Sequence, residues 1–177
     1  MRGKQITIYG ETTKSARDDW RTPIEIIELV RKIYGGTIDT DPCASDDPKH
    51  WFANENYDRK HNGLTRHWIG KVYINNPYGK NTLDWIRVGN AEYAAARAMR
   101  EIWLVPARLD TKWWRELMKF CSAFAIKNGR VRFEGADAGA MFPSALVYLG
   151  IDRADFVHAL DQQKWTLYEP FIRARLP

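Results

Sequence analysis

Cysteine is scarce in this sequence, which contains only Cys43 and Cys121. Two cysteines provide no framework of spaced pairs, so a disulfide-stapled fold is not indicated and a reducing compartment is expected. Neither cysteine lies at a metal-binding spacing from a histidine, and the histidines at positions 50, 61, 67 and 158 have no ligand spacing of their own. We therefore interpret the histidines as surface or loop residues and expect no bound metal.

Long hydrophobic runs are also missing. Residues 1–10 are polar and lack the apolar core of a signal peptide, and no stretch approaches the roughly 20 apolar residues that span a bilayer. Internal repeats, linkers and low-complexity tracts are absent from the sequence as well. We expect a cytoplasmic protein without a membrane partner, in which residues 1–177 form a single domain with a short flexible N-terminus at about residues 1–18.

Aromatic residues, in contrast, are plentiful. They make up 13% of the 177 residues, and eight of them are Trp. With a hydrophobic fraction of 45%, they predict a folded core with rings left over for stacking. The formal net charge of +5 and the pI near 9.2 favour a polyanionic partner, although many basic proteins bind no polyanion.

Helical and strand patterns alternate along the chain. Thr22 is placed as an N-cap, Pro23 as a first helical residue and Glu25 as the far end of a capping box, and helical spacing of apolar residues continues to Gly35. Further helices are predicted at about 81–99, from Asp110 or Thr111 to 118, and from Asp152 or Asp155 onward. Strands are predicted at 37–41, 72–75, 102–105, 122–127, 130–134 and 144–149, and residues 46–70 are interpreted as a loop.

This alternation predicts the fold class. Helices between short buried strands indicate an α/β fold with a mostly parallel sheet and right-handed crossovers. The short link between residues 134 and 144 predicts an antiparallel final strand pair.

A polar tetrapeptide, Asn75-Asn76-Pro77-Tyr78, follows the apolar run at 72–74. In open α/β sheets, ligands bind outside the carboxyl ends of strands. The Asn75 side-chain oxygen and the Asn76 main-chain carbonyl would accept the two protons of an exocyclic amino group while Tyr78 stacks on the base. An ordinary strand-to-loop exit explains the same residues, because Asn, Pro and Gly are common in loops.

A second polar turn follows the strand predicted at 37–41. Asp39 and Asp41 flank the end of that strand, and Pro42-Cys43-Ala44-Ser45 predicts a tight turn where a nucleoside would bind. Asp followed by Pro is also a frequent loop signal. The residues by themselves leave both interpretations open.

Taken in order, these segments resemble the phage-type DNA N-6-adenine methyltransferase family. The resemblance covers about residues 20–150 of the sequence. The matching segments are Trp20-Arg21-Thr22-Pro23, Asp39-Thr40-Asp41-Pro42-Cys43-Ala44-Ser45, Asn62-Gly63-Leu64 with Trp68, Asn75-Asn76-Pro77-Tyr78, Trp85-Ile86, Leu104-Val105-Pro106-Ala107-Arg108 with Asp110-Thr111 and Trp113-Trp114, and Gly129-Arg130-Val131-Arg132-Phe133.

The resemblance implies a Rossmann-like fold and the transfer of a methyl group from S-adenosyl-L-methionine to the N-6 amino group of adenine in DNA. It implies that residues 75–78 are catalytic. Residues predicted to bind the cofactor are Asp39, Asp41, Pro42, Cys43 and Ala44 in the loop after the first strand, Trp20, Thr22 and Pro23 at the amino-acid part, and Asn62 near the adenine.

The sequence departs from expected patterns in two segments, from the commoner methyltransferase pattern in the cofactor loop and from the family pattern in the tetrapeptide. The glycines usual in the cofactor loop are replaced by Ala44 and Ser45, so the turn must be shaped differently. Asn76 stands where the family has the first of two prolines. An Asn retains the main-chain carbonyl that the reaction needs, but its side chain could compete for the hydrogen bond.

DNA contacts are expected from basic residues near the predicted strand ends. Lys80, Arg108, Arg130 and Arg132, with Lys112, could bind phosphates, although each is also compatible with an ordinary solvated charge. No separate recognition domain is evident. Sequence specificity is therefore expected to be modest or to depend on residues 46–70 or 134–143.

Two other classes of function remain open on the sequence alone. A metal-dependent nuclease would need clustered carboxylates, for which Asp39, Asp41 and Glu55 are candidates. Alternatively, Asn76 marks a decayed motif in a protein that binds nucleic acid or cofactor with little or no catalysis.

Overall fold

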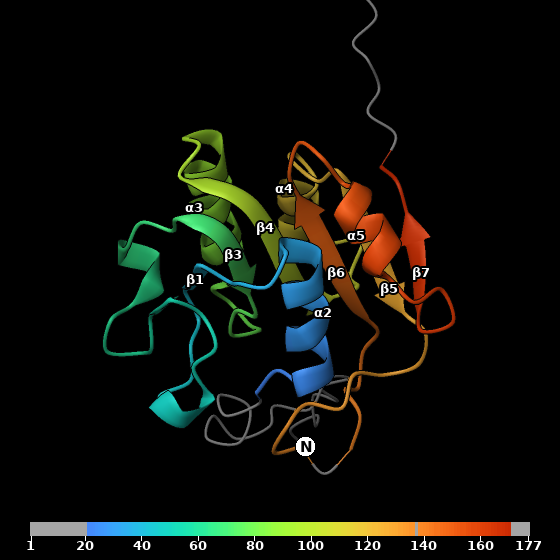
Figure 1. Ribbon diagram of the computed structural model, residues 1–177, viewed down its shortest axis with the longest axis horizontal. Helices are drawn as coiled ribbons and strands as arrows, with labels where there is room; N and C mark the ends of the chain where they lie inside the picture. The colour runs from blue at the N-terminus through green and yellow to red at the C-terminus, as the bar shows by residue number, and fades with distance from the viewer. Residues whose placement is uncertain (1–20, 137, 171–177) are drawn as a thin grey trace, which may run out of the picture.

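The central strands of the structure bury apolar side chains on both faces, so helices must cover both faces of the sheet. The computed structural model describes residues 21–136 and 138–170 (Figure 1). The strands are β1 (Thr40–Asp41), β2 (Glu55–Asn56), β3 (Gly70–Ile74), β4 (Ala98–Pro106), β5 (Ala123–Lys127), β6 (Ser144–Leu149) and β7 (Trp165–Tyr168). The helices are α2 (Ile24–Tyr34), α3 (Thr82–Ala94), α4 (Lys112–Leu117) and α5 (Ala154–Ala159), with short 3-10 helices η1 (Pro48–His50) and η2 (Gly63–Thr65).

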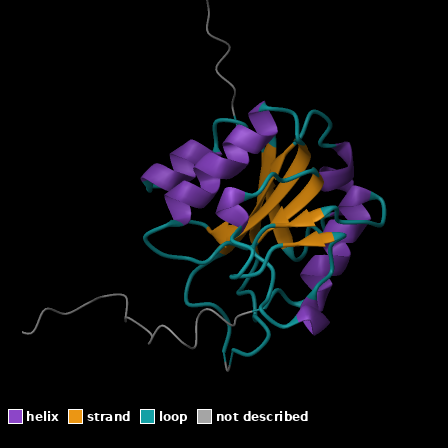
Figure 2. Ribbon diagram, turned by 90° about the vertical axis from the view of Figure 1, so that its left-hand side faces the viewer, coloured by secondary structure: helices purple, strands orange, loops and turns teal. Residues whose placement is uncertain are grey.

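Three layers result, with helices on both sides of the sheet (Figure 2). One face carries Tyr73, Ile102 and Leu104, which pack against α2 and α5. The opposite face carries Val72, Ile74, Trp103 and Val105, which pack against α3 and α4. In Figure 1, α2 and α5 accordingly lie in front of the sheet and α3 and α4 behind it. No helix within the described ranges has the length and apolar character needed to cross a bilayer.

The sheet is mixed, and the expectation of a mostly parallel Rossmann-like sheet was wrong. The strand order is β2-β1-β3-β4-β6-β5-β7. The pairs among β2, β1, β3 and β4 are parallel, whereas β4–β6, β6–β5 and β5–β7 are antiparallel. The parallel half agrees with the helix–strand alternation. The other half is antiparallel for two reasons. No helix is described between β5 and β6, and β6 runs back along β5. The segment at 165–168, which had no predicted strand, adds β7 antiparallel to β5.

The predicted strand at residues 130–134 does not form. Within this segment Glu134 makes a single antiparallel bridge to Arg21, and the rest is irregular. The expected antiparallel pair between residues 130–134 and 144–149 is therefore absent from the described structure, and β6 pairs with β4 and β5 instead. This segment runs past the carboxyl end of the parallel strands, which places Phe133 and Glu134 beside the cavity described below.

The predicted helices form, with different ends. Helix α2 begins at Ile24 with Pro23 as its N-cap, so the predicted N-cap role of Thr22 was wrong; its hydroxyl faces Tyr73 instead. Thr111 does cap α4, because its hydroxyl oxygen accepts a hydrogen bond from the Trp114 main-chain nitrogen at 3.2 Å. Helix α3 ends at Ala94, earlier than predicted, and the chain enters β4 at residue 98.

A tryptophan cluster holds α3 close to the sheet. The ring centroids of Trp68 and Trp103 are 5.9 Å apart, and those of Trp68 and Trp85 are 6.2 Å apart. Gly89 permits this approach, because a Cβ atom there would lie 2.3 Å from a ring atom of Trp103. The helix that follows the tetrapeptide is thereby packed firmly on its face of the sheet.

Glu101 is a buried carboxylate in the centre of this sheet. Its side chain has no solvent exposure, and one carboxylate oxygen accepts a hydrogen bond from the Trp103 indole nitrogen at 2.7 Å. The other oxygen has no hydrogen-bond partner among the described residues. Burial raises the pKa of Glu101 to about 8, because the apolar surroundings disfavour the charged form.

We expect Glu101→Gln to make the protein more stable at alkaline pH. The folded-state pKa of Glu101 is raised above its unfolded value, so its contribution to stability is lost as pH rises from about 4.3 to about 8. An amide removes this loss while still accepting from the Trp103 indole. The variant should melt roughly 5 °C or more above wild type at about pH 8.5, and the two should converge at about pH 4. Equal pH slopes of the melting temperature in the two proteins would contradict this account.

Candidate active site

One cavity lies at the carboxyl ends of β1 and β3. Its volume is about 540 Å³, which is in the range of small-molecule sites. Of the residues predicted to be functional, Thr22, Asp41, Pro42, Cys43, Ala44, Asn62, Asn75, Asn76, Pro77 and Tyr78 line it. Segments that are far apart in the sequence thus converge on a single hollow.

The Asn75 side chain is held by hydrogen bonds at both ends of its amide. Its Nδ2 donates to the Thr22 hydroxyl oxygen at 3.1 Å, and that oxygen is hydrogen-bonded to the Tyr73 hydroxyl at 3.0 Å. The Tyr78 hydroxyl lies 2.9 Å from Asn75 Oδ1 and 3.0 Å from the Leu104 main-chain oxygen. It has one proton and can donate it to either of these two acceptors. These contacts orient the amide, with the nitrogen on Thr22 and the oxygen toward Tyr78.

Asn76 is buried, with 2% of its surface exposed. Its Nδ2 donates to the Pro77 main-chain oxygen at 3.0 Å, so the side chain bonds within the tetrapeptide itself. Asn76 Oδ1 is buried and has no hydrogen-bond donor among the described residues. Asn76, a residue of the cavity wall, therefore contributes one unsatisfied buried acceptor.

The loop after β1 is tied down by main-chain hydrogen bonds. The Cys43 nitrogen donates to Asp41 Oδ1 at 2.9 Å, and the Ala44 nitrogen donates to the Tyr57 oxygen at 3.0 Å. Burial raises the pKa of Asp41 to about 7, with the Cys43 hydrogen bond acting in the opposite direction. Burial also raises the pKa of the Cys43 thiol, and the nearby Asp41 raises it further, so this cysteine is no thiolate nucleophile at neutral pH.

The turn at Asn62-Gly63 packs directly against this loop. Asn62 has a left-handed backbone, with φ of 48°. A Cβ atom at Gly63 would lie 2.0 Å from the Pro42 main-chain oxygen, so only glycine allows the approach. The Gly63 oxygen in turn accepts from the Trp68 indole nitrogen at 2.8 Å. The glycine positions Asn62 at the cavity and is more than a generic turn residue.

Several cavity residues had no predicted role. Aromatic rings come from Trp51, Phe52, Tyr57, Trp85 and Phe133, and charged or titratable groups from Arg21, His50 and Asp58, among others. Most belong to residues 46–70, whose lack of periodicity conceals the ordered contacts of the loop. Phe133 belongs to the segment at 129–133 that resembles the family, and this resemblance was the signal in the sequence that could have identified it as a site residue.

Asp58 is one of the carboxylates that line the cavity. Hydrogen bonds from the main chain and ring of His61 and from the Lys60 main chain lower the pKa of Asp58, against a smaller opposing effect of burial. The same oxygen accepts all three of these hydrogen bonds. This carboxylate therefore shapes the loop at Asn62.

Pro23 and Asp39, which were also predicted to bind the cofactor, do not line the cavity. Trp20 is outside the described residues, and Pro23 is the buried N-cap of α2. Asp39 is not brought to the cavity, because its carboxylate accepts from the Lys71 main-chain nitrogen at 2.8 Å and from Asn54 Nδ2 at 3.3 Å. The predicted phosphate contacts are all exposed and do not line the cavity: Lys80, Arg108, Lys112, Arg130 and Arg132.

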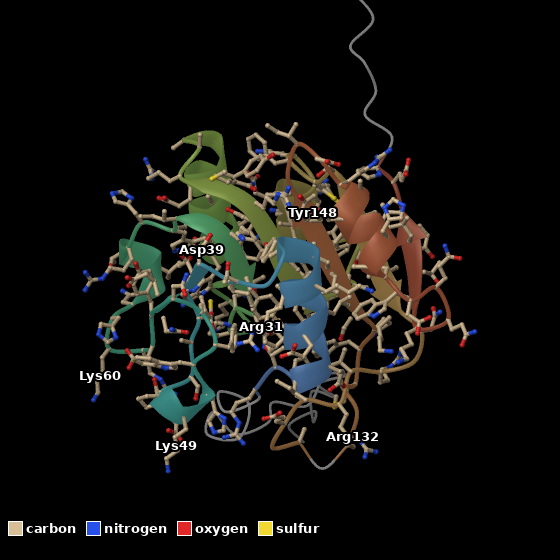
Figure 3. All side chains as sticks on the ribbon, viewed as in Figure 1. Arg31, Asp39, Lys49, Lys60, Arg132 and Tyr148 are labelled. Atoms are coloured by element: carbon tan, nitrogen blue, oxygen red, sulfur yellow. The ribbon has the colours of Figure 1, made fainter. Side chains whose placement is uncertain are left out.

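Basic side chains lie around the end of the molecule that carries the cavity. Figure 3 shows Lys49 and Lys60 pointing outward from the loop at one side of this end and Arg132 at the other side. Arg31 lies between them on α2 and contributes to the cavity lining. A polyanion laid across this end would meet positive charge on both sides.

Carboxylates are not gathered into a metal site in the described part of the chain. No group of three or more His, Cys, Asp or Glu side chains is placed there to hold a metal ion. Asp41 lies in the cavity wall, whereas Asp39 and Glu55 do not. The arrangement that a metal-dependent nuclease would need is therefore not formed by these three residues.

Comparison with known proteins gives one match. A family model described as DNA N-6-adenine-methyltransferase (Dam) matches residues 9–145, which is most of the chain. No curated protein and no solved structure matches the sequence. The match covers both the loop after β1 and the tetrapeptide after β3, whose side chains meet in the cavity. The chain belongs to the DNA N-6-adenine-methyltransferase (Dam) family.

Proposed function

We propose that this protein transfers a methyl group from S-adenosyl-L-methionine to the N-6 amino group of adenine in DNA. Membership of the family supports the reaction class. The observation that carries the proposal is the oriented amide of Asn75, which lies in a cavity beside the Asn76 carbonyl and the Pro77 turn. Together these groups supply two acceptors at the end of a buried strand, which is what an amino group with two protons requires.

The cavity suits a nucleoside that carries an amino acid. Thr22 and the start of α2, the loop from Asp41 to Ala44, and the turn at Asn62 and Gly63 all line the cavity. We assign the amino-acid part of the cofactor to Thr22 and the nucleoside to residues 41–44 and 62. When bound, the cofactor supplies an activated methyl group on a positively charged sulfur.

The protein's own groups make the substrate nitrogen reactive. The lone pair of an adenine amino group is delocalised into the ring, and it becomes available when both protons are held by acceptors that favour tetrahedral geometry. Asn75 Oδ1 and the Asn76 carbonyl are these acceptors in the proposal. The Tyr78 hydroxyl can transfer its hydrogen bond from Asn75 Oδ1 to the Leu104 oxygen as the amine arrives. The protein would lower the barrier further by aligning the amine with the methyl group and by dipoles that are already oriented, so that they need no reorganisation at the moment of reaction.

The target base must leave the DNA stack to reach this cavity. Turning out a base costs a few kcal/mol of unstacking, and stacking on an aromatic side chain recovers about 1–3 kcal/mol. Tyr78 and Phe133 line the cavity, with ring centroids 6.5 Å apart. We propose that Lys80, Arg108, Arg130 and Arg132 contact DNA phosphates. Their side chains are exposed and do not line the cavity, so they would not compete with the base for that space.

Labelled methyl transfer tests the proposed function. The protein is incubated with methyl-labelled S-adenosyl-L-methionine and DNA of mixed sequence, and the digested nucleosides are identified by mass spectrometry. The expected product is N-6-methyladenine, with less incorporation as salt rises because phosphate contacts are screened. Label on cytosine, or cofactor binding without any transfer to DNA, would contradict the proposal.

We expect Asn75→Ala to abolish transfer while leaving cofactor affinity largely intact. The variant loses one of the two acceptors for the substrate amine, and losing a single preorganised polar group of this kind costs about 10²–10³ in rate. Single-turnover rates on DNA and calorimetric titration with S-adenosylhomocysteine measure the two quantities separately. Transfer at the wild-type rate in this variant would remove the mechanism proposed above.

Thr22→Val should slow transfer roughly tenfold, and Thr22→Ser should restore most of it. Valine has the shape of threonine but cannot accept the hydrogen bond from Asn75 Nδ2, so the amide loses its fixed orientation. Serine keeps the hydroxyl and serves as the matched control. Rates are compared at saturating cofactor, so that a change in cofactor affinity does not enter. Equal rates for the valine and serine variants would show that this hydrogen bond does not position Asn75.

A further inference from the structure

We propose that the side-chain oxygen of Asn76 accepts a hydrogen bond from the 6-amino group of the cofactor's own adenine ring. Asn76 would then select an adenine nucleoside over one with a different group at that ring position. The inference rests on the proposed function and gives a role to the residue that departs from the family pattern.

The first observation is an unsatisfied acceptor in the cavity wall. Two residues that line the cavity each have one buried side-chain atom without a hydrogen-bond partner among the described residues: Arg21 Nε and Asn76 Oδ1. Of these, only Asn76 Oδ1 can accept a hydrogen bond. A buried acceptor without a donor costs free energy, which a bound donor would recover.

The orientation of the Asn76 amide is determined by its other end. Nδ2 donates to the Pro77 main-chain oxygen at 3.0 Å. Exchanging the amide nitrogen and oxygen would bring two oxygens together, so the assignment of Oδ1 as the unpaired end is the chemically sensible one. The acceptor is therefore held rigidly in one direction.

Strand geometry separates Asn76 from the acceptor for the substrate amine. Tyr73 packs on the α2 face of the sheet and Ile74 on the Trp85 face. Successive side chains along a strand point to opposite faces, and continuing this alternation past the end of β3 at Ile74 places Asn75 on the side of Tyr73 and Asn76 on the side of Ile74. The contacts of Asn75 with the Thr22 and Tyr78 hydroxyls agree with this placement. The two amide oxygens can then serve two different amino groups.

The cavity on the Asn76 side is suited to a flat purine. Trp85 lines it, and Cys43 and Tyr57, which pack against the same aromatic cluster, line it too. Gly63 brings the turn that carries Asn62 against the Pro42 carbonyl and narrows this part of the site. The 6-amino group of adenine is a donor and needs an acceptor in such a wall, and Asn76 Oδ1 is the buried acceptor that is left unpaired.

Two cofactor-derived nucleosides that differ at this ring position provide the test. S-adenosylhomocysteine carries the 6-amino group, whereas S-inosylhomocysteine carries a 6-oxo group whose oxygen would face Asn76 Oδ1. Calorimetric titration of the full chain gives the affinity for each. We expect wild type to bind S-adenosylhomocysteine about tenfold or more tightly than its 6-oxo counterpart.

Substitution of Asn76 should remove this preference. In Asn76→Leu, and in Asn76→Pro, which restores the residue usual in the family, the ratio of the two affinities should fall to within about twofold. Asn90→Leu is the matched control. Asn90 is also a buried Asn whose Oδ1 is unpaired among the described residues and whose Nδ2 donates to the Glu116 oxygen at 2.8 Å, but it lies outside the cavity. This control should keep the wild-type ratio.

The outcomes separate the inference from the proposed function. If wild type binds S-adenosylhomocysteine with no preference over the 6-oxo form, or if the preference survives in both Asn76 variants, the role assigned to Asn76 is wrong and methyl transfer is unaffected as a proposal. Loss of the preference in Asn90→Leu as well would also contradict the assignment, because an effect of general destabilisation would then explain it. Failure of wild type to bind either nucleoside would overturn both.

Discussion

The chain of hydrogen bonds from Tyr73 through Thr22 and Asn75 to Tyr78 is the constraint on which the account of the site depends. An amide has an acceptor end and a donor end of nearly the same shape, and only the acceptor end can hold a substrate amine. The Thr22 hydroxyl accepts from the nitrogen and thereby turns the oxygen toward Tyr78 and the cavity. The chain also joins three segments distant in sequence, since the Tyr78 hydroxyl reaches the Leu104 carbonyl of β4.

The rest of the fold keeps these segments at hydrogen-bonding distance. Tyr73 has no solvent exposure and lies in a strand that is hydrogen-bonded to β1 and β4. On the opposite face, the close approach at Gly89 seats α3 against Trp103, so the tetrapeptide is held between a rigid strand and a rigid helix. Because protein interiors are close-packed, these elements move little relative to one another, and the amide geometry is prepared before any ligand binds.

The local part of this structure could be predicted from the sequence, and the non-local part could not. The helix after Pro23, the Thr111 cap and the resemblance to the adenine methyltransferase family are confirmed. Thr22 was predicted as a helix cap because capping is a local pattern, whereas its actual partners, Tyr73 of β3 and Asn75 just after it, lie far along the chain. The sheet was predicted as mostly parallel for the same reason, since strand direction depends on pairing between distant segments. The roles of the individual site residues remain predictions.

A crystal structure of the protein with S-adenosylhomocysteine tests the central claim most directly. The account predicts that the ligand lies between residues 41–45 and 75–78. The Asn75 nitrogen should remain on the Thr22 hydroxyl, and Asn75 Oδ1 should face the space beside the ligand's sulfur where the target amine must enter. A ligand bound away from these residues, or an Asn75 amide turned so that its nitrogen faces that space, would contradict the account.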